Sequence, residues 1–155
     1  MPENKRYYVD ETGINKYLYR CYGYAIRGVK VEGEIPGKKY ERMSIVAAQC
    51  GSEIIERHEY GCNMNSRLFE FWFAMLLKAI PRGSVIILDN ATFHRKKILA
   101  LMAKKAKCRI IFLPPYSPDL NPIEHLWANL KKWLANHLTG FASLSDACFA
   151  FFGVG

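Results

Sequence analysis

The sequence has 155 residues, of which half are hydrophobic and 14% are aromatic, so it suffices for one domain with its own hydrophobic core. Its formal net charge of +8 favours a polyanionic partner or an acidic surface, although a basic protein without such a partner fits the charge equally well. Five cysteines without a Cys-x-x-Cys pair argue against a disulfide framework and a structural zinc site, and the polar N-terminus and short apolar runs lead us to expect neither a signal peptide nor a membrane span.

The first part of the chain predicts an antiparallel meander of strands. Residues 5–10 contain Tyr7, Tyr8 and Val9, which favour a strand, and residues 11–13 are expected to end it. Further strands are predicted at residues 22–31, 43–50 and 53–59, with a link rich in Gly, Pro and Lys at residues 33–39.

From residue 65 onward the apolar pattern takes the period of a helix. Asn65 or Ser66 can cap a helix that runs to about Ile80, and Pro81 and Gly83 end it. Its apolar residues cover nearly the whole circumference, so we expect this helix to be buried on most sides.

A βαβ unit is predicted next. Residues 85–88 and 110–113 are short continuous apolar runs, which are typical of central strands covered on both faces. Between them, residues 95–107 predict a basic helix whose apolar side chains face inward, namely Ile98, Leu99, Leu101 and Met102.

The last part of the chain combines a rigid loop with helices. Residues 113–118 hold three prolines and cannot be helical. Asn121 is expected to cap a helix with Pro122 at its first position, and apolar residues then recur at helical spacing up to Leu138. A short final helix is predicted at residues 144–151. This order of elements predicts one α/β domain with a mixed sheet.

Three acidic residues occupy positions where α/β sheets assemble their sites. Asp10 ends the first predicted strand, Asp89 follows the run at residues 85–88, and Glu124 lies in the first turn of a helix. Carboxylate oxygens suit magnesium or manganese rather than zinc. Two such ions about 4 Å apart can activate a water or hydroxyl and stabilise the leaving oxygen of a phosphodiester.

Each of these acids also has a purely structural interpretation. Asp10 and Glu11 point to opposite faces of a strand, so we expect only one of them to join an acidic cluster, and both fit a strand end. Asp89 fits turn chemistry after a buried strand. Glu124 lies three residues after Asn121, the position of a capping-box acid, and periodicity alone favours that role.

Three segments together match a known family. They are residues 8–13 (YVDETG), residues 87–91 (ILDNA) with His94, and residues 113–124 (LPPYSPDLNPIE) with Trp127 and Lys131. The third segment is long and unusual, and thirty-four residues separate Asp89 from Glu124, a spacing typical of the family. From about residue 7 to residue 135, the sequence resembles the catalytic domain of bacterial insertion-sequence transposases related to the mariner superfamily.

The resemblance implies a ribonuclease-H-like fold, with a mixed five-stranded sheet flanked by helices. It implies that Asp10, Asp89 and Glu124 form a DDE-type catalytic triad that holds two Mg²⁺ ions, with Mn²⁺ as a substitute. By the same resemblance the protein is a DNA transposase. Water nicks DNA at a transposon end, and the freed 3′-hydroxyl attacks target DNA by in-line phosphoryl transfer.

Five residues near Asp89 are candidates for supporting the metal ligands or contacting DNA. Asn90 and His94 belong to the matching segment, although a turn and a helix start account for them equally well. Arg95, Lys96 and Lys97 begin a predicted helix, where charge and free backbone amides bind phosphate. A solvated basic face is the alternative for these three.

The resemblance also implies partners and a location. We expect transposon terminal inverted repeats and target DNA as partners, a homodimer in a synaptic complex, and a cytoplasmic, nucleoid-associated location in a bacterium. Residues 1–155 are expected to be a catalytic domain without the N-terminal helix-turn-helix domain of family members, so an upstream helix-turn-helix polypeptide is an expected partner. A ribonuclease H or resolvase on the same fold, and an inactive DNA-binding remnant, remain alternatives.

Overall fold

A computed structural model of the protein describes residues 5–15 and 42–153. The strand expected at residues 22–31 and the link expected at residues 33–39 lie outside the described residues. In the part of the chain that is described, no helix is both long enough and apolar enough to cross a membrane.

The described strands form one five-stranded sheet in the order β3-β2-β1-β4-β5. β1 (Arg6–Asn15), β2 (Arg42–Cys50) and β3 (Glu53–Tyr60) are antiparallel neighbours, which confirms the described part of the predicted meander. β4 (Val85–Leu88) runs parallel to β1, and β5 (Arg109–Phe112) runs parallel to β4. The predicted mixed five-stranded sheet is therefore confirmed.

β1 is longer than the sequence predicts, because it continues to Asn15 instead of ending at Asp10. Every residue from Glu11 to Asn15 pairs with a residue of β2. Pairing with a neighbouring strand thus overrides the low strand propensity of the Glu-Thr-Gly segment. Asp10 and Glu11 therefore lie in the middle of β1 rather than at the end of the strand.

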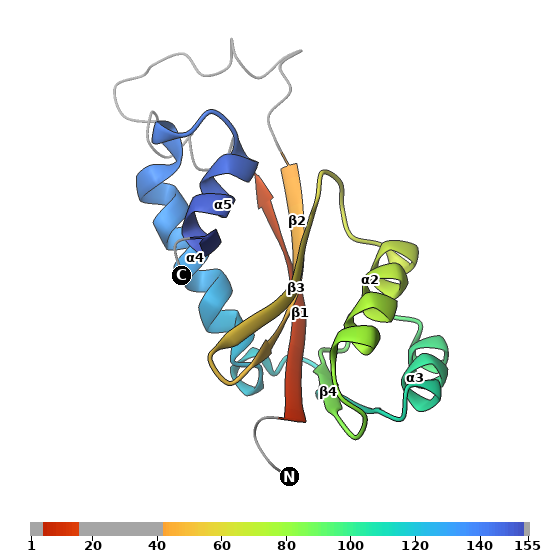
Figure 1. Ribbon diagram of the computed structural model, residues 1–155. Coiled ribbons are helices and arrows are strands. Elements are labelled where there is room, and N and C mark those ends of the chain that lie inside the picture. The colour runs from red at the N-terminus through yellow and green to blue at the C-terminus, as the bar shows by residue number, and fades with distance from the viewer. Residues whose placement is uncertain (1–4, 16–41, 154–155) are drawn as a thin grey trace.

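Helices cover both faces of the sheet (Figure 1). α2 (Ser66–Ala79) and α3 (Lys96–Lys105) lie on one face, and α4 (Ile123–His137) and α5 (Leu144–Gly153) lie on the other. The side chain of Asn65 caps α2 by accepting a hydrogen bond from the Leu68 N–H at 3.0 Å, as predicted. β4, α3 and β5 form the predicted βαβ unit.

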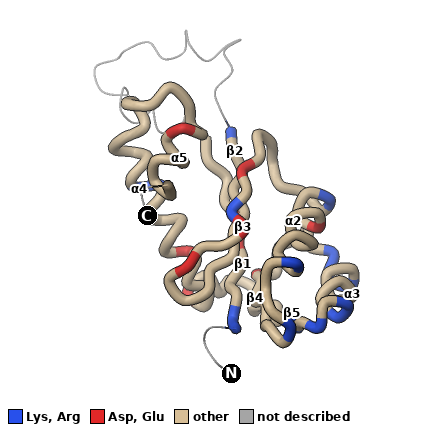
Figure 2. Tube along the Cα trace, in the orientation of Figure 1, with Lys and Arg blue, Asp and Glu red and all other residues tan. Residues whose placement is uncertain are grey.

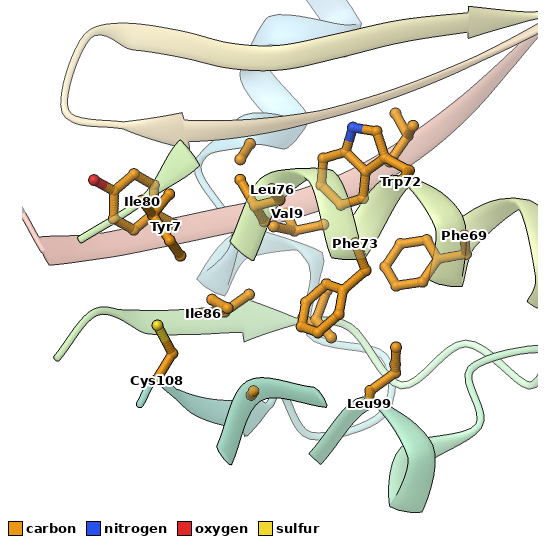
Figure 3. Packing of buried hydrophobic residues seen from close by; sticks show 14 residues of the cluster. Tyr7, Val9, Phe69, Trp72, Phe73, Leu76, Ile80, Ile86, Leu99 and Cys108 are labelled. Atoms are coloured by element: carbon orange, nitrogen blue, oxygen red, sulfur yellow. The ribbon is translucent and has the colours of Figure 1, made fainter. Parts of the chain in front are cut away.

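Each face of the sheet has its own hydrophobic core. On the α2 face, Phe69, Trp72, Phe73 and Leu76 pack against Val9 and its neighbours (Figure 3). On the α4 face, the core contains Ile14, Ile45, Ile123, Leu130 and Leu134, among others. Side chains alternate along β1, so Val9 belongs to the first core and Ile14 to the second. β1 is therefore covered on both sides.

Three apolar side chains are more exposed than predicted. Among the described strands, β5 lies at the edge of the sheet with one neighbour, so Ile111 is 46% exposed instead of buried in a central strand. In α2, Phe71 is 66% exposed because the helix packs on the sheet through one face only. In α3, Leu101 is 60% exposed, whereas Leu99 and Ala103 face the core. Apolar periodicity does not distinguish an edge strand from a central one.

Two phenylalanines of α2 provide a matched test of this packing. We expect Phe73→Ala to lower the free energy of unfolding by about 3–5 kcal/mol, because Phe73 is fully buried. We expect Phe71→Ala to change it by about 0.5 kcal/mol or less, because Phe71 is largely exposed. Urea denaturation of the two variants measures both values. Equal losses of stability would contradict this packing of α2.

Candidate active site

The pairing of two parallel strands brings Asp10 and Asp89 together. Val9 of β1 pairs with Leu88 of β4, and this is the last pair between the two strands. Asp10 and Asp89 are the next residues along the two chains, so they lie side by side just beyond the last β1–β4 pair. β1 then continues along β2, whereas the chain after Asp89 leaves the sheet. In α/β folds, such a point beyond the carboxyl ends of parallel strands is where sites form.

Asp10 points towards α4 and is held there by a tryptophan. Asp10 is 5% exposed, and its carboxyl group accepts a hydrogen bond at 3.1 Å from the indole N–H of Trp127. Trp127 lies one helical turn after Glu124 on the same side of α4. The sequence analysis placed Trp127 in the third matching segment and did not predict a partner for its indole. The available signal was that a buried indole N–H requires an acceptor.

Asn121 fastens the start of α4 to β1 next to Asp10. Its side-chain amide donates a hydrogen bond to the carbonyl oxygen of Val9 at 3.3 Å, and only 2% of the residue is exposed. α4 itself begins at Ile123, one residue later than predicted. The side-chain oxygen of Asn121 accepts a hydrogen bond from the Ile123 N–H at 3.4 Å, so Asn121 still satisfies a helix-start donor.

The backbone at Asn121 also bears on the capping interpretation of Glu124. In a capping box, the carboxylate of Glu124 accepts a hydrogen bond from the backbone N–H of Asn121. Here that N–H donates to the carbonyl oxygen of Pro118 at 3.1 Å. Glu124 instead lies close enough to Asp10 to raise the pKa of that carboxyl group. Glu124 is therefore directed at the acidic residues rather than at its own helix start.

Four carboxylates influence one another at this place. The pKa of Asp10 is raised to about 9, first by burial and then by the nearby carboxylates of Glu11, Glu124 and Asp89. Burial also raises the pKa of Glu11. His94 lowers this pKa, whereas Asp89 and Glu124 raise it further. Such a cluster is destabilising by itself, and a bound cation relieves the repulsion.

Glu11 reaches the cluster from the opposite face of the sheet. It lies near His94, next to the α2 core, and its Oε1 is 3.8 Å from Nε2 of the imidazole. Asp10 and Glu11 thus point to opposite faces, as predicted. The expectation that only one of them joins the cluster is wrong, because Asp89 lies at the edge between the two faces and both residues approach it.

The donor atoms gathered here suit a divalent cation. Within the described residues, two buried carboxylate oxygens have no hydrogen-bond partner, Oε2 of Glu11 and Oδ1 of Asp89. Ligand atoms of Glu11, Asp89 and His94 lie within 4.8 Å of one another. Buried carboxylates without partners are costly unless they are paired or coordinate a metal. The carboxylate oxygens among these donors are the ligand type that Mg²⁺ and Mn²⁺ prefer.

A cleft of about 510 Å³ lies beside these acids. Asp89, Asn90 and Glu124 line it together with the proline-rich loop at residues 113–118. In this loop Tyr116 is completely exposed and has a positive φ of 57°, which bulky residues rarely adopt. The cleft therefore gives an extended ligand access to Asp89 and Glu124.

The basic residues near Asp89 have different environments. Arg95 donates two hydrogen bonds to the carboxylate of Glu70 in α2. The ammonium group of Lys96 lies 5.1 Å above the ring of Phe112, and Lys97 is exposed. Figure 2 shows that Lys and Arg gather around α3. Their role in DNA binding, and that of Asn90 on the cleft wall, stays a prediction.

Comparison with protein families identifies the group to which the chain belongs. A family model described as DDE superfamily endonuclease matches residues 5–145. The chain is a member of this family. Among curated proteins, this DDE superfamily endonuclease is 26% identical to the uncharacterized protein y4pE/y4sA of Sinorhizobium fredii over 109 residues, 68% of each chain. It is 36% identical to the Tc1 transposase of Caenorhabditis elegans over 58 residues, 37% of this chain and 21% of that protein.

Solved structures share the fold of this DDE superfamily endonuclease. The Mos1 transposase paired-end complex with the left transposon end matches 84% of this chain with a TM-score of 0.62 and 16% identity. The Mos1 catalytic domain with raltegravir and Mn matches 86% with a TM-score of 0.58 and 17% identity. The predicted ribonuclease-H-like fold is thereby confirmed. This chain covers 42% and 62% of those two chains.

The raised pKa of Asp10 predicts how stability depends on pH without metal. The folded protein retains the Asp10 proton up to about pH 9, whereas an unfolded chain releases it near pH 4. The unfolded state therefore binds fewer protons between these values, and the free energy of unfolding falls as pH rises through this window. We expect Asp10→Asn to flatten this fall, measured by urea denaturation at pH 5 and pH 8.5 in EDTA. Asp119→Asn, at an exposed position, serves as the control, and an equal slope in both variants would refute the assignment.

Proposed function

We propose that this chain is the catalytic domain of a DNA transposase that cleaves transposon ends and joins them to target DNA. The observation that carries the proposal is that Asp89 and Glu124, which line the cleft, both lie close enough to Asp10 to raise its pKa, in a member of the DDE superfamily endonuclease family. The similarity to the Tc1 transposase and the fold shared with Mos1 transposase support it.

The acidic residues are suited to hold two divalent ions. Asp10, Asp89 and Glu124 would bind them, and Mg²⁺ or Mn²⁺ fits because all three supply carboxylate oxygens. Solved Mos1 catalytic-domain structures contain Mg or Mn, which supports this choice for a chain with the same fold. When bound, the ions supply charge to the attacking and leaving oxygens of a phosphodiester.

The chain's own residues position the substrate and the ligands. The cleft between Asn90 and the proline-rich loop admits a phosphodiester next to Asp89 and Glu124. Trp127 and Asn121 fix Asp10 and the start of α4 relative to each other. In the first step, water attacks phosphorus, the bond to the 3′-oxygen breaks, and a 3′-hydroxyl is released. In the second, that hydroxyl attacks a target phosphodiester in line and displaces its 3′-oxygen.

DNA binding outside the cleft is assigned to the basic surface around α3. Lys96, Lys97 and Arg95 lie at the start of this helix, where positive charge and the helix dipole favour phosphate. By similarity to Mos1, whose structure is a paired-end complex, we propose a homodimer that joins two ends. Residues 1–155 form the catalytic domain, and a helix-turn-helix segment outside them recognises the inverted repeats. The protein acts at the bacterial nucleoid.

Substitution of Asp89 tests the proposed nuclease directly. We expect the chain to nick DNA carrying the inverted repeats that flank its reading frame when Mg²⁺ or Mn²⁺ is present. Asp89→Asn keeps the side-chain shape but removes a ligand charge, so cleavage should fall by about a hundredfold or more. Gel analysis of labelled DNA measures this, with Asp146→Asn in α5 as a matched control.

Each alternative function has its own result in the same assay. Preferential cutting of RNA–DNA hybrids would replace the transposase proposal with a ribonuclease H. Salt-sensitive binding without any metal-dependent cleavage would identify an inactive DNA-binding remnant. Full activity in Asp89→Asn would rule out the proposed triad.

Trp127 provides a second test, as a positioning residue for Asp10. Trp127→Phe keeps an aromatic ring but removes the N–H that holds the Asp10 carboxyl group. We expect the concentration of Mg²⁺ that gives half-maximal cleavage to rise by roughly 10- to 100-fold, as for other groups that orient metal ligands. Trp133→Phe, also in α4 but stacked on His137, should leave it unchanged. A loss of activity without any shift in metal dependence would contradict the positioning role.

A further inference from the structure

His94 is a buried histidine whose ring is not satisfied. Its side chain is completely inaccessible to solvent, and neither ring nitrogen has a hydrogen-bond partner among the described residues. A buried polar group without a partner costs free energy, so such groups mark places where a ligand or ion belongs. Packing against the aromatic core satisfies neither ring nitrogen.

The ring is held rigidly in place by its neighbours. Its centroid lies 4.3 Å from that of Phe69 and 4.6 Å from that of Phe93. The hydroxyl of Ser66 donates a hydrogen bond to the Phe93 carbonyl at 2.6 Å, and the His94 backbone N–H donates to the Ala91 carbonyl at 3.1 Å. The loop between β4 and α3 is thereby fixed to the start of α2. This rigidity fits a metal ligand, whose ring orientation must be set in advance.

Two carboxylates face the ring at distances too long for hydrogen bonds. Nε2 lies 3.8 Å from Oε1 of Glu11, and Nδ1 lies 3.6 Å from Oδ1 of Asp89. Atoms that bind the same ion at bond lengths near 2.1 Å lie roughly 3–4 Å apart. The ligand atoms of all three residues are within 4.8 Å of one another. The Nδ1–Oδ1 distance therefore already equals that between two ligands of one ion, and Glu11 offers an oxygen within 4.8 Å.

We propose that Glu11, Asp89 and His94 bind a first-row transition-metal ion on the α2 face of β1. Nδ1 of His94 and Oδ1 of Asp89 bind the ion together with Oε2 of Glu11, the buried oxygen without a partner.

The imidazole gives this ligand set a metal preference that carboxylates alone do not have. Nitrogen donors favour Co²⁺, Ni²⁺ or Zn²⁺, whereas Mg²⁺ and Mn²⁺ prefer oxygen. Asp89 belongs both to this set and to the set with Asp10 and Glu124, so the proposed site adjoins the active site. Metal binding at this site does not depend on the proposed DNA cleavage, because the affinity for the ion can be measured without DNA.

Titration of the whole chain with Co²⁺ and Mg²⁺ tests the proposal. Calorimetry gives the affinities, and the visible absorption of bound Co²⁺ reports a nitrogen ligand. We expect His94→Gln to weaken Co²⁺ binding by about tenfold or more and to leave Mg²⁺ binding within about twofold. His94→Phe, which keeps the packing against Phe69, should do the same. Glu124→Gln and the exposed His137→Asn should retain the Co²⁺ signal of this site.

The opposite results are equally distinct. If both His94 variants fold and bind Co²⁺ as the unmodified chain does, the proposal is overturned, and His94 is only an ion-pair partner of Glu11 and Asp89. If neither variant folds, Glu11→Gln and ¹⁵N NMR of the imidazole in the unmodified chain replace them. A paramagnetic shift of the His94 ring nitrogens with Co²⁺ supports the site, and its absence refutes it. Absence of DNA cleavage would refute the proposed function and leave these binding results unaffected.

Discussion

The burial of carboxylates close to one another is the constraint on which this structure depends. Burial, and then the neighbouring carboxylates, raise the pKa of Asp10 to about 9. In water each of these side chains would be ionised and hydrated, so bringing them together in the folded chain costs free energy. Nothing in the hydrophobic cores requires this arrangement. The cores instead supply the stability that offsets it, because β1 is packed between α2 on one side and α4 on the other.

The fold delivers each acid to this place by a different route. Parallel pairing of β1 with β4 sets Asp10 beside Asp89. α4 brings Glu124, and Asn121 and Trp127 keep that helix in register with β1. The alternation of side chains along β1 then sends Glu11 to the other face, towards His94. One strand thus presents carboxylates to both sides of the sheet, and Asp89 connects the two groups.

Local patterns in the sequence predict the elements better than their contacts. Asp10, Asp89 and Glu124 could be selected because each stands beside a recognisable strand or helix start. The edge position of β5 could not be predicted, because an apolar pair such as Ile110 and Ile111 occurs in both central and edge strands. The sequence also did not predict the hydrogen bond from Trp127 to Asp10. Nor did it predict that the Asn121 N–H would donate to the Pro118 carbonyl rather than to Glu124. These depend on which distant segments meet, and residue spacing does not contain that information.

The two bonds that anchor α4 have a consequence for how the protein folds. Asn121 and Val9 are 112 residues apart in the chain, and Trp127 and Asp10 are 117 apart. Contacts across such separations form slowly, because the chain between them loses its freedom before they are made. The β2–β3 hairpin and the β4–α3–β5 unit close over short loops and can form earlier. The acids are therefore gathered by contacts of the slow class, in the step in which α4 also completes the second core, and a chain whose α4 has not docked lacks the assembled acidic cluster.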